Sequence, residues 1–98
     1  MNTRHAQLVL AVVREGSFTA AAKSLFVTQP TLSQQIRQIE QQLGQPIFER
    51  STTPVSLTPA GQTLLTGAED LLRQADALAA AVHTAAEAAA EPPEPPEA

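Results

Sequence analysis

The sequence predicts a mainly α-helical fold, in which three helices and a short two-stranded hairpin are followed by one long helix. Residues 28–43 place apolar side chains on one helical face behind a good N-cap residue. Residues 55–57 alternate apolar and polar side chains, as a short strand does. Residues 64–89 repeat leucine, valine and alanine at alternating spacings of four and three, which is the heptad pattern of a helix with a helical partner.

The first two helices are expected to be separated by a glycine. Residues 4–15 carry apolar side chains at helical spacing, and Gly16 follows in the position that favours a left-handed residue after a helix. Ser17 can then cap a second, short helix, whose inward face includes Phe18, Leu25 and two alanines small enough for another helix to cross closely. A turn of about three residues is expected before the next helix.

The third helix is expected over residues 27–43. Thr28 can accept a hydrogen bond from a first-turn N–H, and Pro30 stands within the first turn, where its missing donor costs little. The apolar stripe of this helix consists of Leu32, Ile36, Ile39 and Leu43. Polar side chains off the stripe gather towards its start: Gln29, Thr31, Ser33, Gln34 and Arg37. Amides suit an adenine edge, hydroxyls suit several bases, and arginine suits guanine or phosphate.

Two short helices joined in this way, the second polar on its outer face, form the helix-turn-helix pattern of DNA-binding proteins. An ordinary solvated face or a small structural helical domain has the same spacing, so both alternatives stay open at this point.

Residues 47–57 are expected to form a hairpin with the polar turn STTP at its tip, a wing that could approach the DNA backbone or minor groove. Thr58 and Pro59 supply an N-cap and N1 pair for the long helix.

The long helix, residues 59–90, is expected to be a dimerisation element. Alanine at positions 68, 75 and 89 of this heptad series lets two helices approach closely. The predicted dimer interface consists of Leu64, Ala68, Leu71, Ala75, Leu78 and Val82. The alternative is a helix that packs only on its own domain, or one that is merely rich in alanine, the residue of highest helix propensity. The tail 91–98, rich in proline and glutamate, is expected to be disordered.

Composition narrows the class of protein. A chain of 98 residues, of which 43% are hydrophobic, forms one small domain without room for a large catalytic core, so no enzyme activity is expected. The sequence has no cysteine, and His5 and His83 are far apart, so no disulfide, metal site or cofactor is expected. No apolar run could span a membrane and no signal peptide is recognisable, so an intracellular protein is expected.

The net charge of −4 is unusual for a DNA-binding protein. The charge is unevenly spread, however. Residues 1–62 hold five basic and three acidic residues, a net of +2, whereas residues 63–98 hold one basic and seven acidic residues, a net of −6. Because the acidity belongs to the C-terminal part, the first 62 residues can still attract phosphate, though only modestly.

Residues 1 to about 90 resemble the N-terminal DNA-binding module and linker helix of the LysR-type transcriptional regulators. The resemblance rests on EGSFTAAAKSL, VTQPTLSQQIRQIEQQLG, IFER and VSLTPAG, which stand in the order and spacing of the family. It implies a winged helix-turn-helix domain over residues 1–58 and a dimerisation linker helix over residues 59–90. It also implies a homodimer, or a higher oligomer, formed through antiparallel linker helices and bound to inverted-repeat promoter DNA in the bacterial cytoplasm.

The resemblance also suggests which residues meet DNA. Base reading is expected from Gln29, Pro30, Ser33 and Gln34. Contacts with the DNA backbone or through the wing are expected from Thr28, Thr31, Arg37, Arg50 and Thr53. Gln34 and Thr53 stand where many members have arginine, so binding is expected to be weaker or to read other bases.

Family members continue into an effector domain, which does not follow here, so no inducer pocket is expected in this chain. A stand-alone regulator, a truncated one and a chain cut at the linker all stay open. The expected function is sequence-specific binding of duplex DNA by a homodimer that regulates transcription. The alternative is a dimerising protein-interaction module that modulates another regulator without binding DNA, and it would show no salt-dependent affinity for duplex DNA.

Overall fold

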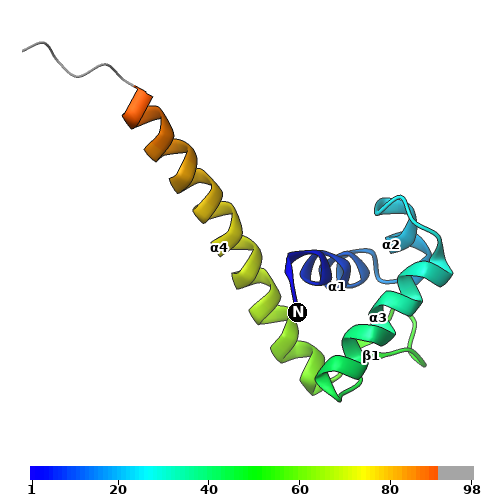
Figure 1. Cartoon of the computed structure of the whole chain (residues 1–98). Helices are drawn as coiled ribbons and strands as arrows, with labels where there is room; N and C mark the ends of the chain where they lie inside the picture. The colour runs from blue at the N-terminus through cyan, green and yellow to red at the C-terminus, as the bar shows by residue number, and fades with distance from the viewer. Residues whose placement is uncertain (91–98) are drawn as a thin grey trace, which may run out of the picture.

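The computed structural model describes residues 1–90, and the tail predicted for residues 91–98 lies outside the described residues. The elements are α1 (Thr3–Glu15), α2 (Phe18–Ser24), α3 (Gln29–Leu43), β1 (Phe48–Glu49), β2 (Ser56–Leu57) and α4 (Pro59–Ala90). The first three helices form a compact unit with the hairpin, and α4 extends away from it (Figure 1). The predicted mainly helical fold with a two-stranded hairpin is therefore confirmed.

Local residues set the boundaries of the helices. The side chains of Ser17 and Thr28 accept hydrogen bonds from first-turn N–H groups of α2 and α3, at 3.0 and 3.3 Å. Gly16 and Gly44 end α1 and α3 with φ angles of 74° and 70°, the left-handed conformation that glycine adopts without a steric penalty. Asn2 caps α1, so this helix begins one residue earlier than expected.

One apolar core joins the three helices, the hairpin and the start of α4. Its largest fully buried side chains are Leu8, Val9, Val12, Leu32, Ile36, Ile39 and Ile47. Complete burial of one such side chain contributes about 1.5–3 kcal/mol. The predicted stripe of α3 is thus confirmed for three of its members but is wrong for Leu43, which is 44% exposed. Leu43 is the last residue of α3 and lines an open groove with Ile47 and Leu64, at the edge of the core.

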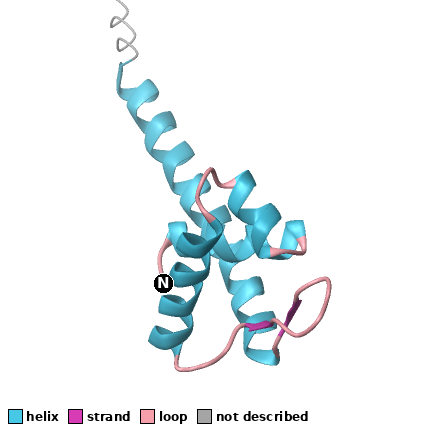
Figure 2. Cartoon of the chain, turned by 90° about the vertical axis from the view of Figure 1, so that its right-hand side faces the viewer, coloured by secondary structure: helices cyan, strands magenta, loops and turns pink. Residues whose placement is uncertain are grey.

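The hairpin is short and anchored to the helices. Its antiparallel strands pair Phe48 with Leu57, and we call residues 48–57 the wing. The N–H of Val55 donates to the carbonyl of Gly16 at 3.0 Å, which ties the wing to the loop between α1 and α2. Figure 2 shows the long loop of the wing projecting from the body of the helices.

The first half of α4 packs on its own domain, more extensively against α1 than against any other element. Ala68 is only 2% exposed, and Leu64 lies half-buried against the core. The interface prediction is therefore wrong for Ala68, because this residue is buried within its own domain, where α4 packs mainly against α1. Leu71 and Ala75 are half-buried, whereas every residue of α4 beyond Ala75 is exposed.

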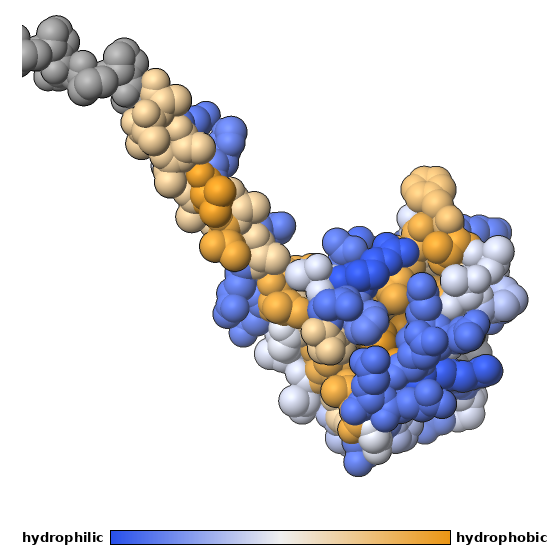
Figure 3. Space-filling view, viewed as in Figure 1, coloured by the Kyte–Doolittle hydropathy of each residue, from blue (hydrophilic) through white to orange (hydrophobic). Residues whose placement is uncertain are grey.

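Figure 3 shows apolar side chains in a band along this extended part of α4. None of the helices in residues 1–90 is long and apolar enough to cross a bilayer.

Candidate nucleic-acid interface

The start of α3 and the loop of the wing lie on the same side of the molecule, opposite the free part of α4 (Figure 1). The fold thus gathers the two segments that the sequence predicts to meet DNA. The predicted contact residues on α3 and its cap are exposed, except for half-buried Ser33: Thr28, Gln29, Pro30, Thr31, Gln34 and Arg37. Thr28 fixes the N-terminal start of α3 through its capping hydrogen bond, so these side chains project from an ordered first turn.

Two exposed hydrogen bonds already join polar side chains on this face. The Gln29 amide nitrogen donates to the hydroxyl of Ser33 at 3.2 Å, and the Thr28 hydroxyl donates to the Thr31 hydroxyl at 2.8 Å. Exposed bonds of this kind exchange with water at little net cost. The same groups can therefore turn to base edges or phosphates, and the pairing of Gln29 with Ser33 holds two predicted base-reading side chains one helical turn apart.

The wing turn is organised by Thr52, which the sequence analysis did not single out. Its hydroxyl donates towards the carbonyls of Glu49 and Pro54, at 3.2 and 3.0 Å, and lies 3.0 Å from the hydroxyl of Ser56. Threonine hydroxyls commonly bond to nearby backbone in turns, so the STTP sequence did hold a signal for this role. Thr53, the predicted contact at the tip, is exposed beside it.

Arg50 lies differently from the other predicted contacts. Its guanidinium pairs with the carboxylate of Glu40 at 2.8 Å and stacks over the Phe18 ring, 4.9 Å from the ring centre. The Phe18 ring in turn meets Phe48 edge to face, with ring centres 5.7 Å apart. The side chain of Arg50 is 36% exposed, so it belongs to the junction between the helices and the wing as well as to the surface.

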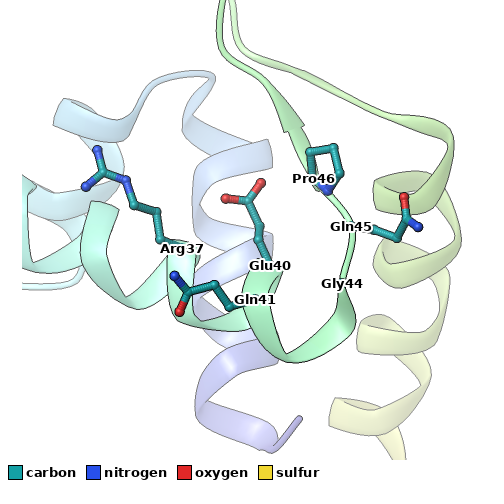
Figure 4. Close-up of a pocket in the computed structure, with 6 residues that line it drawn as sticks. All are labelled: Arg37, Glu40, Gln41, Gly44, Gln45 and Pro46. Carbon is teal, nitrogen blue, oxygen red and sulfur yellow. The ribbon is translucent and has the colours of Figure 1, made fainter.

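Glu40 lines a shallow groove of about 390 Å³ with the end of α3 and the segment that leads into β1 (Figure 4). Its side chain points towards that segment, where its second oxygen accepts the N–H of Ile47 at 2.8 Å, while Arg37 extends away from it (Figure 4). Sequence reasoning missed Glu40, because its partners Ile47 and Arg50 are 7 and 10 residues away and no helical or strand periodicity joins them.

Phe26 is a second residue whose structural role sequence reasoning missed. It lies in the turn that was predicted before the third helix. It is 96% exposed and adopts a φ of 58°, in the left-handed region that a non-glycine residue rarely occupies. The N–H of Phe26 donates to the carbonyl of Lys23 at 3.2 Å, so this conformation closes the end of α2 immediately before the cap of α3.

Comparisons with known proteins agree with this geometry. A family model described as "Bacterial regulatory helix-turn-helix protein, lysR family" matches residues 3–62. The transcriptional regulator BudR of Klebsiella aerogenes is 44% identical over 77 residues, which cover 79% of this chain and 54% of BudR. The regulator BenM of Acinetobacter baylyi is 43% identical over 76 residues, 78% of this chain and 25% of BenM. The chain thus spans about half the length of BudR and a quarter of BenM.

Two solved structures have the same fold. The BenM DNA-binding domain in complex with catB site 1 DNA has a TM-score of 0.85 and 39% identity, and the match covers 90% of this chain and 95% of that one. The DNA-binding domain of CbnR in complex with DNA has a TM-score of 0.82 and 35% identity, with 88% and 99% covered. The fold is therefore the winged helix-turn-helix of a DNA-binding, transcription-regulating domain. This chain belongs to the lysR family of bacterial regulatory helix-turn-helix proteins.

Proposed function

We propose that the chain binds duplex DNA sequence-specifically as a homodimer and so regulates transcription. The observation that carries the proposal is the exposed start of α3, which presents amides and hydroxyls from a capped helix on the same side as the wing. A helix of this kind fits the major groove, where each base pair offers a distinct pattern of donors and acceptors. The likeness to DNA-binding domains that were solved in complex with DNA supports DNA as the ligand.

The residues divide into two roles in this proposal. Base edges are read by Gln29, Pro30, Ser33 and Gln34. The DNA backbone is contacted by Thr28, Thr31 and Arg37, with Thr53 at the wing. Phosphate contacts supply affinity and register, whereas contacts with base edges supply the discrimination between sequences.

The homodimer is proposed to form through the exposed part of α4. Leu78 and Val82 are 67% and 61% exposed, which is unusual for large apolar side chains at heptad positions of a helix in water. Half-buried Leu71 and Ala75 continue the same face, and half-buried Leu64 lies further along it. A two-fold dimer presents two copies of α3 to DNA, so it favours an inverted-repeat promoter site. Since the proposed ligand is chromosomal DNA, the proposed location is the bacterial cytoplasm, at the nucleoid.

Selection of bound sequences from a random duplex pool, followed by titration at several salt concentrations, tests this proposal. Wild-type affinity should fall as salt rises, because the cationic side chains of the bound protein displace counterions from the DNA, and this release is less favourable at high salt. Gln29→Ala should lose about 1–3 kcal/mol of discrimination at one base pair while keeping its affinity for random duplex. Gln42→Ala, an exposed glutamine at the other end of α3, is the matched control and should behave as the wild type.

A wild-type protein without affinity for duplex DNA at any salt concentration would overturn the proposal and favour a protein-interaction module. An equal loss by Gln29→Ala on selected and random duplex would remove Gln29 from the base-reading set.

A further inference from the structure

We infer that Glu40 is a positioning residue for DNA binding, which fixes the wing on α3 through Arg50 and the backbone of Ile47. On this inference Arg50 sets the orientation of the wing and is not itself a phosphate ligand. The inference rests on the proposed function, because the wing matters only if it meets DNA.

Both oxygens of the Glu40 carboxylate are engaged. One accepts from the Arg50 guanidinium and the other from the N–H of Ile47, each at 2.8 Å. Ile47 immediately precedes β1 and Arg50 immediately follows it. A single carboxylate on α3 therefore holds both ends of the first strand of the wing, and its side chain is only 16% exposed. Charge-assisted hydrogen bonds of this length are the stronger kind in proteins.

Arg50 extends the same junction to a third element. Its guanidinium stacks over Phe18, the first residue of α2, while its N–H group binds the carboxylate on α3. The Phe18 ring meets Phe48 of β1 edge to face. A guanidinium offers a flat face and in-plane donors at once, which is why arginine and not lysine can make both contacts. The orientation of the wing relative to α3 is thus set by one connected group of side chains.

This arrangement argues against Arg50 as a phosphate ligand. The N–H that binds Glu40 can reach a phosphate only if it leaves the carboxylate. A phosphate on another N–H of the guanidinium would approach the negative charge of Glu40, which repels it. Arg37 is not held by Glu40 in this way, since its side chain is exposed and extends away from that carboxylate (Figure 4). Arg37 therefore suits the phosphate role, and Arg50 suits the positioning role.

The substitution Glu40→Gln should change the affinity for DNA in opposite directions if Arg50 is a phosphate ligand and if it is a positioning residue. Glutamine keeps the size of the side chain and an acceptor for the N–H of Ile47, but it loses the charge that holds Arg50. If Glu40 merely held back a phosphate ligand, freeing Arg50 would tighten DNA binding and steepen the dependence of affinity on salt. We expect the reverse, a weakening by about five- to tenfold on a duplex with full flanks and no steeper salt slope.

A second duplex separates positioning from a general loss of folded protein. On a duplex trimmed so that the wing has no flank to contact, Glu40→Gln and wild type should bind equally, whereas a partly unfolded variant would bind less on both duplexes. Glu69→Gln makes the same charge change at an exposed position of α4 and should leave both affinities unchanged. Arg50→Lys keeps the positive charge but not the stacked fork, so it should lose affinity on the full duplex as Glu40→Gln does.

The outcomes distinguish the inference from the proposed function. Wild type without duplex binding would overturn both. Wild type that binds normally, together with Glu40→Gln that binds the full duplex equally or more tightly, would overturn the inference alone. Arg50→Lys with full wild-type affinity would also overturn it, because charge without orientation would then suffice.

Discussion

The carbonyl oxygen of Ile47 lies against the first turn of α4 at Gly61, where an added Cβ would be 2.2 Å from it. The same carbonyl accepts the N–H of Thr58 at 2.9 Å, and the Thr58 hydroxyl, 3.2 Å from it, caps α4 through the N–H of Gly61 at 3.0 Å. Two backbone segments are in contact where the wing joins α4, and neither segment can shift without losing these hydrogen bonds. Only glycine allows this approach.

Gly61→Ala should therefore lower the free energy of unfolding by at least about 1–3 kcal/mol, the usual cost of forcing a group into a packed site. Gly67→Ala is the control on the same helix, since a Cβ there meets nothing within 4 Å. It should raise stability by about 0.5–1 kcal/mol, because alanine has the higher helix propensity. Urea unfolding followed by circular dichroism measures both, and equal effects of the two substitutions would contradict the close approach.

Phe26→Asn should stabilise the chain by up to about 1 kcal/mol. Asparagine tolerates the left-handed conformation better than phenylalanine does, and a side chain that is 96% exposed has little burial to lose. Phe18→Asn is the contrasting change, because Phe18 packs against Phe48 and Arg50, and it should destabilise. Thermal unfolding compares them. A lower melting temperature for Phe26→Asn would mean that this phenylalanine has a structural partner.

Leu78→Lys should convert the proposed dimer to folded monomers, because it places a charge in the proposed helix contact but leaves the packing of the domain untouched. Ala80→Lys adds the same charge on the opposite face of α4, at an exposed position, and should leave the dimer intact. Sedimentation velocity provides the measurement. A wild type that is monomeric at tens of micromolar, roughly the range of weak association, would exclude this interface.

Thr53→Arg should tighten DNA binding and steepen the slope of log affinity against log salt by about one unit, most strongly on A- and T-rich flanks. Thr53 is exposed in the wing loop, so an arginine there can reach a narrow minor groove without disturbing the core. Thr84→Arg makes the same substitution at an exposed position of α4 and controls for the added charge. If the two variants bind alike on all flanks, the wing does not contact DNA.

The sequence by itself determined the order of the elements and most of their ends, although α1 begins one residue earlier than expected. Ser17, Thr28 and Thr58 act as caps, and Gly16 as a left-handed end, because these effects involve residues three or four positions apart. The buried face of α3 followed from spacing for the same reason. The exposed polar residues at the start of α3 could also be listed from the sequence, and their roles on DNA stay predictions.

Tertiary structure decided which of several residues that look equivalent in the sequence become buried or paired within the chain. Ala68 and Leu78 occupy the same heptad pattern, yet Ala68 is buried where the first half of α4 packs on its own domain, and Leu78 in the second half is exposed. Arg50 reads as a surface cation in the sequence, but the fold brings it to Glu40 and Phe18. Periodicity reports which side of one helix is apolar, whereas these outcomes depend on where a second element stops covering it or which distant charge it meets.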